Sequence, residues 1–213
     1  MEQIKKFFME LRERVDFKFY PVILAPVIIF LLTPIFIKWL PLHFANENSL
    51  IENFQLVVIL FAFIFCLKAK TDKPFFYSMA LVMIILFLRE INCGRTVFFL
   101  VPGGGPNAFY SWKEIPYGYL AHPLYGLFMV CSGLYFIFSK SYKTLWNYFL
   151  HAKLSVYTWA LMFLGIIFGV AGEEIGAFML EEMAETLFYV SITALLFLQG
   201  FNKNYIETTE KYN

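Results

Sequence analysis

The sequence predicts an all-α integral membrane protein that folds as a bundle of six transmembrane helices. Of its 213 residues, 60% are hydrophobic and only 15% are charged, whereas a soluble domain is usually about 25% charged. Several apolar runs also approach the roughly 20 residues that an α-helix needs to cross a bilayer. The six spans are expected near residues 20–40, 51–68, 75–94, 117–138, 155–173 and 178–199.

The segments that flank the spans give the chain two further parts. In residues 1–19, apolar side chains from Ile4 to Val15 fall at helical spacing, with lysine and arginine between them. This pattern is typical of an amphipathic helix on the inner membrane surface, and it equally fits a helix packed on the protein's own cytoplasmic face. Residues 20–199 then form the transmembrane domain, and residues 200–213 form a short cytoplasmic tail.

Basic residues determine the expected orientation. Of the 17 lysines and arginines, 13 fall near the termini or in the connections after the second and fourth spans, on the side that holds both chain ends. Cytoplasmic loops of membrane proteins are enriched in these residues, so both termini are expected in the cytoplasm. The opposite, outer side holds 9 of the 16 acids and 4 basic residues. No basic tract suggests binding to nucleic acid.

Charged residues gather near the outer ends of the spans. A carboxylate at membrane depth is expensive, so its default interpretation is functional. On a rise of about 1.5 Å per residue, Glu185 lies roughly 10 Å beyond the start of its helix, inside the hydrocarbon edge. The residues expected at this depth are Glu52, Gln55, Arg89, Glu90, His122, Glu173, Glu174, Glu181, Glu182 and Glu185.

The last span brings like charges together, because Glu181 and Glu182 precede Glu185 by four and three residues. Such pairs repel one another on a helix face. A protonated acid, an ion pair with Arg89 or a bound metal ion could each relieve the repulsion. For a metal, the expected ligands are Glu182, Glu185 and His122, and glutamate with histidine suits Zn, Fe or Mn. The histidine also fits a hydrogen-bonded residue of the membrane interface.

The acids and the arginine have structural interpretations as well. Glu181 and Glu182 fall in the first turns of a helix, where the helix dipole favours acids. Arg89 could form a structural ion pair with Glu185, or a helix-end pair with Glu90 at the membrane surface. These alternatives need no ligand and no chemistry.

The fifth span indicates which of its acids faces the bundle. Gly165, Gly169 and Glu173 are spaced by four, and a stripe of small residues marks close helix packing in membranes. Glu173 is therefore expected to point inward, and Glu174 to turn toward water. The outer connection over residues 95–116 contains a Gly-Gly-Gly-Pro stretch and is interpreted either as a lid over the bundle or as a plain interfacial loop.

The segment Arg89–Arg95, REINCGR, resembles the E-I-S-W-G-Q segment of a group of uncharacterised bacterial multi-pass inner-membrane proteins. This chain differs from that segment by Asn92 and Cys93 in place of Ser-Trp, and by Arg95 in place of Gln. The resemblance covers about half of the chain, in short pieces.

Three other places resemble the same group. Its members have a glutamate and a glutamine that open an early span, like Glu52 and Gln55, and a histidine at the outer end of a later span, like His122. They end in a Glu-Glu-x-x-Glu span, like Glu182 and Glu185. The resemblance implies a shared site and a bacterial inner membrane, and it implies no particular activity.

The favoured functional hypothesis is a membrane enzyme with a metal-dependent or acid/base site that faces the outer leaflet. Its substrate would be a lipid, a lipid-linked group or an exported peptide, and membrane lipids are its expected partners. Its expected catalytic residues are Glu185, Glu182, Glu52, Glu90 and Arg89.

Two other classes of function remain open. A cation- or proton-coupled transporter is one, because acid clusters at membrane depth are common in transporters. The inner half of every predicted span lacks a charge, however, which argues against a continuous ion path. A non-catalytic subunit or sensor, whose acids hold a partner helix or a divalent ion, is the other.

Overall fold

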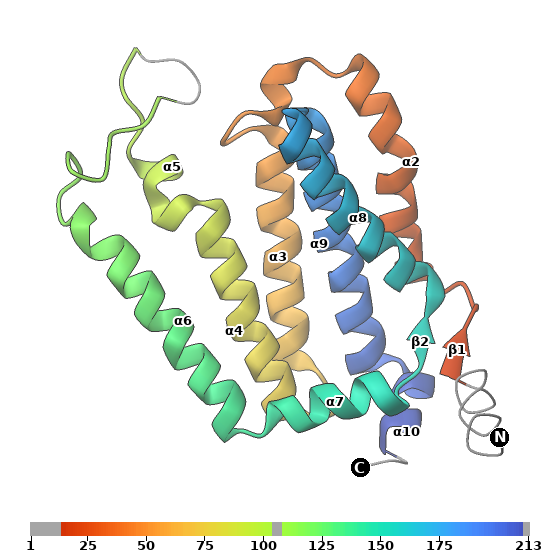
Figure 1. Ribbon diagram of the computed structural model, residues 1–213. Helices are drawn as coiled ribbons and strands as arrows, with labels where there is room; N and C mark the ends of the chain where they lie inside the picture. The colour runs from red at the N-terminus through yellow and green to blue at the C-terminus, as the bar shows by residue number, and fades with distance from the viewer. Residues whose placement is uncertain (1–13, 104–107, 211–213) are drawn as a thin grey trace.

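The computed structural model describes residues 14–103 and 108–210, whose regular secondary structure is nearly all helix (Figure 1). Within them, 5 helical segments are long and apolar enough to cross a membrane. The helices Lys73–Glu90 and Asn92–Phe98 meet at an angle of 54°. If this bent pair is counted as one span, the number of candidate membrane spans is 6. The predicted class, an all-α protein with several apolar spans, is therefore confirmed.

The connections between the long helices include single turns of 3-10 helix (η). The elements are β1 (Val15–Asp16), η1 (Pro21–Ile23), α2 (Leu24–Trp39), η2 (Leu42–Ala45), α3 (Leu50–Lys68), α4 (Lys73–Glu90), η3 (Asn92–Gly94), α5 (Arg95–Phe98), η4 (Gly118–Leu120), α6 (Ala121–Phe138), α7 (Ser141–His151), β2 (Leu154–Ser155), α8 (Val156–Ile175), α9 (Phe178–Phe201) and α10 (Lys203–Glu210).

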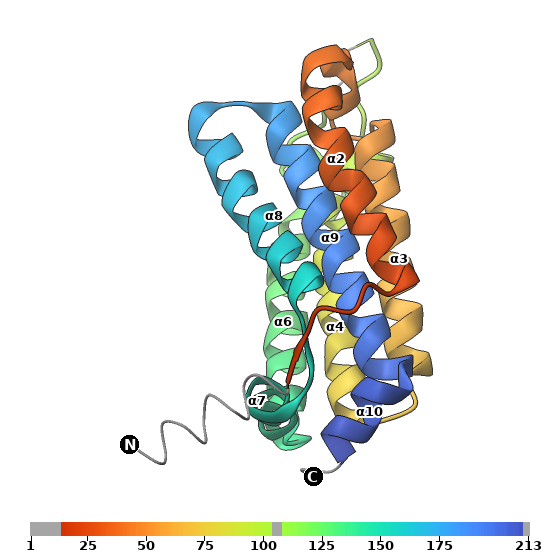
Figure 2. The same cartoon turned by 90° about the vertical axis from the view of Figure 1, so that its right-hand side faces the viewer.

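Helix α9 is the centre of the bundle. It packs against α8, α3 and α2, and Figures 1 and 2 show it between these helices. Its buried residues lie on several faces, as expected for a helix that has neighbours on more than one side. Helix α4 packs on α3, and α6 lies at the edge of the bundle, where it packs on α4. The main apolar core joins α3, α4 and α9 through side chains such as Ile59, Phe76 and Tyr189.

Two glycines allow α8 to approach the backbone of α9. A Cβ atom added at Gly165 would lie 2.8 Å from the main-chain nitrogen of Phe188, and one added at Gly172 would lie 2.7 Å from that of Glu181. Both distances are shorter than real Cβ contacts, and the neighbouring atoms belong to the backbone. The two helices can therefore pack this closely only with glycine at both positions.

Glu173 borders a cleft between α4, α8 and α9 together with Gly165 and Gly169, so it faces the expected side of α8 but is exposed there. Gly172 packs against α9, whereas Glu173 is exposed at the edge of a cleft. Because an α-helix has 3.6 residues per turn, a step of seven residues from Gly165 nearly completes two turns, and a step of eight passes beyond that face. The packed stripe thus reaches Gly172 and leaves Glu173 beside it.

One end of the bundle carries α7, α10 and the β1–β2 pair, and we call it the terminal end (Figure 1). Residues 1–13 of the expected amphipathic helix lie outside the described residues. Its last part is not helical, because Val15–Asp16 form β1 and pair in parallel with Leu154–Ser155. The predicted tail after residue 200 contains α10, in which Tyr205 is fully buried and its ring packs against that of Tyr20.

Helix α7 was not predicted as a separate element. It runs across the terminal end between α6 and α8, and its polar contacts fix it to α4. The Tyr148 hydroxyl donates to Asp72 Oδ2 at 2.7 Å, and Ser78 Oγ donates to Ser141 Oγ at 2.8 Å. Burial, together with the charge of Asp72, raises the pKa of the Tyr148 phenol well above its usual value, so the phenol stays protonated and donates.

The close contact between α8 and α9 predicts different effects of alanine substitution at two glycines. We expect Gly165→Ala to lower the free energy of unfolding by about 1–3 kcal/mol, because the added methyl group meets backbone atoms. Gly169→Ala is the matched control, since its Cβ would lie 3.9 Å from that of Ala184, an ordinary contact. That variant is expected to be neutral or up to about 1 kcal/mol more stable. Unfolding in mixed detergent micelles measures both, and equal stabilities would contradict the packing.

Candidate functional site

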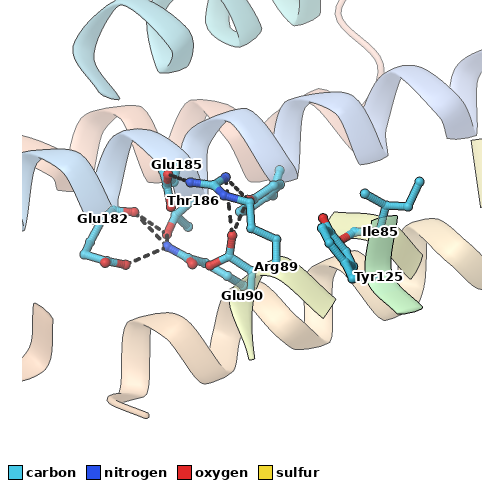
Figure 3. Close-up of polar contacts among 9 residues, drawn as sticks. Ile85, Arg89, Glu90, Tyr125, Glu182, Glu185 and Thr186 are labelled. Atoms are coloured by element: carbon cyan, nitrogen blue, oxygen red, sulfur yellow. Dashed lines mark hydrogen bonds and ion pairs between the residues drawn. The ribbon is translucent and has the colours of Figure 1, made fainter. Parts of the chain in front are cut away.

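The end of the bundle opposite α7 holds the polar site, and we call it the acidic end. Gln55 of α3 is fully buried there, and its Nε2 amide faces three acceptors on α9: the Glu182 carbonyl oxygen and Glu182 Oε2, both at 3.0 Å, and Thr186 Oγ1 at 3.1 Å. The Thr186 hydroxyl in turn donates to the Glu182 carbonyl oxygen at 2.8 Å. These contacts join α3 to the first turns of α9 (Figure 3).

The side-chain oxygen of Gln55, unlike its side-chain nitrogen, has no hydrogen-bond partner in the described structure. Oε1 is buried and has no hydrogen-bond donor among residues 14–103 and 108–210. A buried acceptor without a donor typically costs about 1–3 kcal/mol. Exchanging the amide nitrogen and oxygen would only worsen the arrangement, because the oxygen would then face the oxygens of Glu182. The site therefore keeps one buried acceptor without a partner among the described residues.

Arg89 of α4 is the second centre of the site. Its Nη2 donates to Glu185 Oε1 at 2.9 Å, and its Nη1 lies 3.4 Å from the Tyr189 hydroxyl and 3.6 Å from Glu90 Oε1. The Tyr189 hydroxyl donates to Glu90 Oε1 at 2.5 Å. One guanidinium thus pairs with an acid of its own helix, Glu90, and with an acid of α9, Glu185, as Figure 3 shows. The Arg89 side chain is nevertheless 58% exposed, against 9% for Glu90 and 22% for Glu185.

Glu52 is held by the connection that precedes α3. It is buried and accepts a hydrogen bond from the main-chain nitrogen of Asn48, whose side chain donates to the Thr96 carbonyl oxygen. The residues around Thr96 reach this position because the chain bends sharply after α4, with positive φ angles at Asn92, Cys93 and Gly94. Asn48, held by Glu52, therefore joins the loop before α3 to the segment that follows α4.

A cleft of about 330 Å³ lies beside Arg89, between α4, α8 and α9. Arg89, Glu185 and Tyr189 border it together with Glu173 and Glu181, and the remaining wall is apolar. Glu182 does not line the cleft, because its side chain turns toward Gln55 of α3. Of the acids of the last two spans, Glu173, Glu181 and Glu185 therefore line the cleft, whereas the partly buried Glu182 turns away from it.

The structure brings most of the expected residues together. Glu52, Gln55, Arg89, Glu90, Glu182 and Glu185 all lie at the acidic end, and the hydrogen bonds above arrange them in three groups, around Gln55, around Arg89 and at Glu52. A protonated acid, an ion pair or a metal ion could relieve the repulsion around Glu185, and the structure shows the ion pair with Arg89. Glu174 is exposed and does not line the cleft.

The expected metal ligands are not assembled. His122 of α6 packs edge-on against the Trp112 ring, with 5.0 Å between ring centroids, and Arg95 lies 5.7 Å from the same ring. Within the described part of the chain, no group of three or more His, Cys, Asp or Glu side chains is placed to hold a metal ion. The set Glu182, Glu185 and His122 fails because α4 lies between α6 and α9 (Figure 1).

Sequence reasoning missed three residues that complete the site. Thr186 and Tyr189 follow Glu182 and Glu185 by four residues, and helical spacing would have found both. Asn48 had no such signal, because its role depends on a contact with the bend after α4.

No protein-family model, curated protein or solved structure matches this chain significantly. The resemblance to the bacterial inner-membrane group stays a prediction, and the site is interpreted from its own geometry.

The contacts of Gln55 predict a coupled loss of stability. We expect Gln55→Leu to lower the free energy of unfolding by about 1–3 kcal/mol, because Glu182 loses its buried donor. In a Thr186→Val background the same change should cost at least about 0.5 kcal/mol less, since the two side chains share one cluster. Reversible unfolding of the single and double variants measures this coupling. Additive effects would show that the cluster does not act as a unit.

Proposed function

We propose that this protein is a six-span enzyme of a bacterial inner membrane, and that it performs acid/base chemistry on a lipid or lipid-linked substrate at the outer leaflet. The observation that carries the proposal is the Arg89–Glu185 pair, at 2.9 Å, on the edge of a cleft between three apolar helices. Charged residues within membrane spans that face a cleft typically belong to a functional site.

Each charged residue has a role in this proposal. Arg89 binds the anionic head of the substrate through the exposed part of its guanidinium, which has five N–H donors. Glu185 is the general acid or base, because it reaches the cleft while Arg89 fixes its position. Glu90 and Tyr189 position Arg89 from behind.

The two remaining acids support the site without lining the cleft. Glu182 is a second carboxylate, held by Gln55, and Glu52 fixes the loop that precedes α3. The proposal includes no metal, since the described residues offer no set of three ligands.

The walls of the cleft favour an amphipathic substrate. Its charged residues lie toward the ends of α8 and α4 and the start of α9, whereas Leu86, Ile166 and Phe188 form an apolar wall. A lipid places a polar head and an apolar chain side by side in the same way. A small polar solute would leave the apolar wall without a partner.

The proposed orientation comes from the basic residues. Cytoplasmic loops are enriched in lysine and arginine, so the terminal end is placed in the cytoplasm and the acidic end outside. In this orientation the side of the protein with 9 acids and 4 basic residues lies at the outer leaflet.

Thiol labelling tests the orientation. In a background with all three native cysteines replaced by alanine, a cysteine is introduced at Lys113 or at Lys203, both of which are exposed. We expect Lys113→Cys to react with a membrane-impermeant maleimide in spheroplasts, and Lys203→Cys to react only after permeabilisation. The reverse pattern would contradict the proposed orientation.

Lipid turnover tests the enzyme. The purified protein is reconstituted into vesicles of bacterial inner-membrane lipid extract, and the lipids are followed over time by mass spectrometry. We expect the wild type to convert one lipid class and Glu185→Gln to do so at least about 100-fold more slowly, because it loses the acid/base group. Glu174→Gln is the matched control and should stay within about two-fold of the wild-type rate, since Glu174 lies outside the cleft.

Ion flux in the same vesicles separates this proposal from a transporter. No lipid conversion by the wild type, combined with a proton or cation flux that Glu185→Gln abolishes, would overturn the enzyme and favour transport.

A further inference from the structure

The cleft beside Arg89 carries more negative than positive charge. Glu173, Glu181 and Glu185 border it, and Arg89 is the one basic residue among the described residues that line it. Glu185 is paired with Arg89 at 2.9 Å. The side chains of Glu173 and Glu181 have no hydrogen bond or ion pair with residues 14–103 and 108–210. Two carboxylates on the cleft are therefore left without a cation of their own.

Arg89 keeps hydrogen-bond donors for a ligand. Its bonds to Glu185 and Tyr189 use two of the five N–H groups of a guanidinium, and its side chain is 58% exposed. The other three N–H groups have no hydrogen-bond acceptor in the part of the chain that the structure describes. Open donors and unpaired carboxylates in one cleft indicate a ligand head with both a negative and a positive group.

The charged groups follow a fixed order along the helices. On α9, Phe188 lies deepest, Glu185 lies about one turn nearer the acidic end, and Glu181 lies a further turn outward. One turn corresponds to about 5.4 Å along the helix axis. The end of α8 packs against the backbone of Glu181 and brings Glu173 to the same level. The cleft therefore offers an apolar wall, then the guanidinium of Arg89, then two carboxylates.

We propose that the lipid bound in this cleft is a phospholipid whose head carries a primary ammonium group, an aminophospholipid. The inference rests on the acid/base site proposed above and names the head that this site takes. Acyl chain, phosphate and ammonium follow one another in such a lipid in the order of the cleft. The phosphate accepts hydrogen bonds from the open N–H groups of Arg89, and the ammonium donates to Glu173 and Glu181.

Other ligands would leave part of the cleft unmatched. An anionic lipid without an ammonium would bring a negative head beside two unpaired carboxylates, which repel it. A quaternary ammonium has no N–H group to donate to them. A free cation would leave the donors of Arg89 and the apolar wall without a partner, and the described residues hold no group of three ligands for a metal ion.

Native mass spectrometry of the detergent-purified protein tests the head group. The protein is titrated with three dioleoyl phospholipids that differ only in the head: phosphatidylethanolamine, phosphatidylglycerol and phosphatidylcholine. We expect phosphatidylethanolamine to bind at least about 10-fold more tightly than either of the others, because two partly exposed ion pairs together contribute roughly this factor.

Removal of the two unpaired charges should abolish this preference. The double variant Glu173→Gln, Glu181→Gln is expected to bind phosphatidylethanolamine about 10-fold more weakly than the wild type does. It should bind phosphatidylglycerol at least as tightly as the wild type, since the repulsion is gone. Glu174→Gln is the matched control and should keep the wild-type preference, because Glu174 is exposed and lies outside the cleft.

Equal affinity of the wild type for the three heads would overturn the proposal, and so would a full preference in the folded double variant. Thermal unfolding identifies a variant that does not fold. In that case the single change Glu173→Gln, at an exposed position, decides, and an unchanged preference rejects the proposal.

Lipid turnover judges the enzyme separately. Equal binding of the three heads with conversion of one lipid would reject the ammonium site and keep the enzyme. Selective binding of phosphatidylethanolamine without conversion of any lipid would reject the enzyme and keep the ammonium site.

Discussion

The contact between Arg89 and Glu185 is the interaction on which the acidic end depends. It joins α4 to α9, two helices that otherwise meet mainly through apolar side chains of the core. Without the guanidinium, the side chains of Glu90 and Glu185 would place two negative charges in a partly buried site with no cation beside them. The position of α4 and the shape of the cleft are therefore linked to a single charged group.

The central position of α9 explains why the protein can place acids at this depth. Gly165 and Gly172 bring α8 close on one side, and Gln55 of α3 donates to Glu182 on another. A carboxylate between such neighbours has donors and packed walls around it instead of hydrocarbon. The same helix continues to Gln199, so one rigid element runs from the acidic end to the terminal end.

Much of the fold and part of the site could be predicted from the sequence, for physical reasons. Helix length and apolar composition define the spans, and the rise per residue sets depth, which is why Glu52, Glu90 and Glu185 were expected at one level. Depth does not reveal which helices are neighbours. His122 lies at the right end of its helix, but α6 packs on α4 and not on α9. Glu173 borders the cleft with Gly165 and Gly169, as expected, but it is exposed there, because a four-residue spacing drifts around the helix.

The central helix of the bundle is also the last of its described spans to be synthesised. Chains grow from the N-terminus, so α3 and α4 enter the bilayer while α9 is still to be made. Until then Gln55 has none of its acceptors on α9 and Arg89 has no contact with Glu185. Early insertion intermediates must therefore carry these polar groups without their final partners. Synthesis that stops before α9 would leave helices with both groups exposed, a form that quality-control proteases of the membrane can distinguish from the finished bundle.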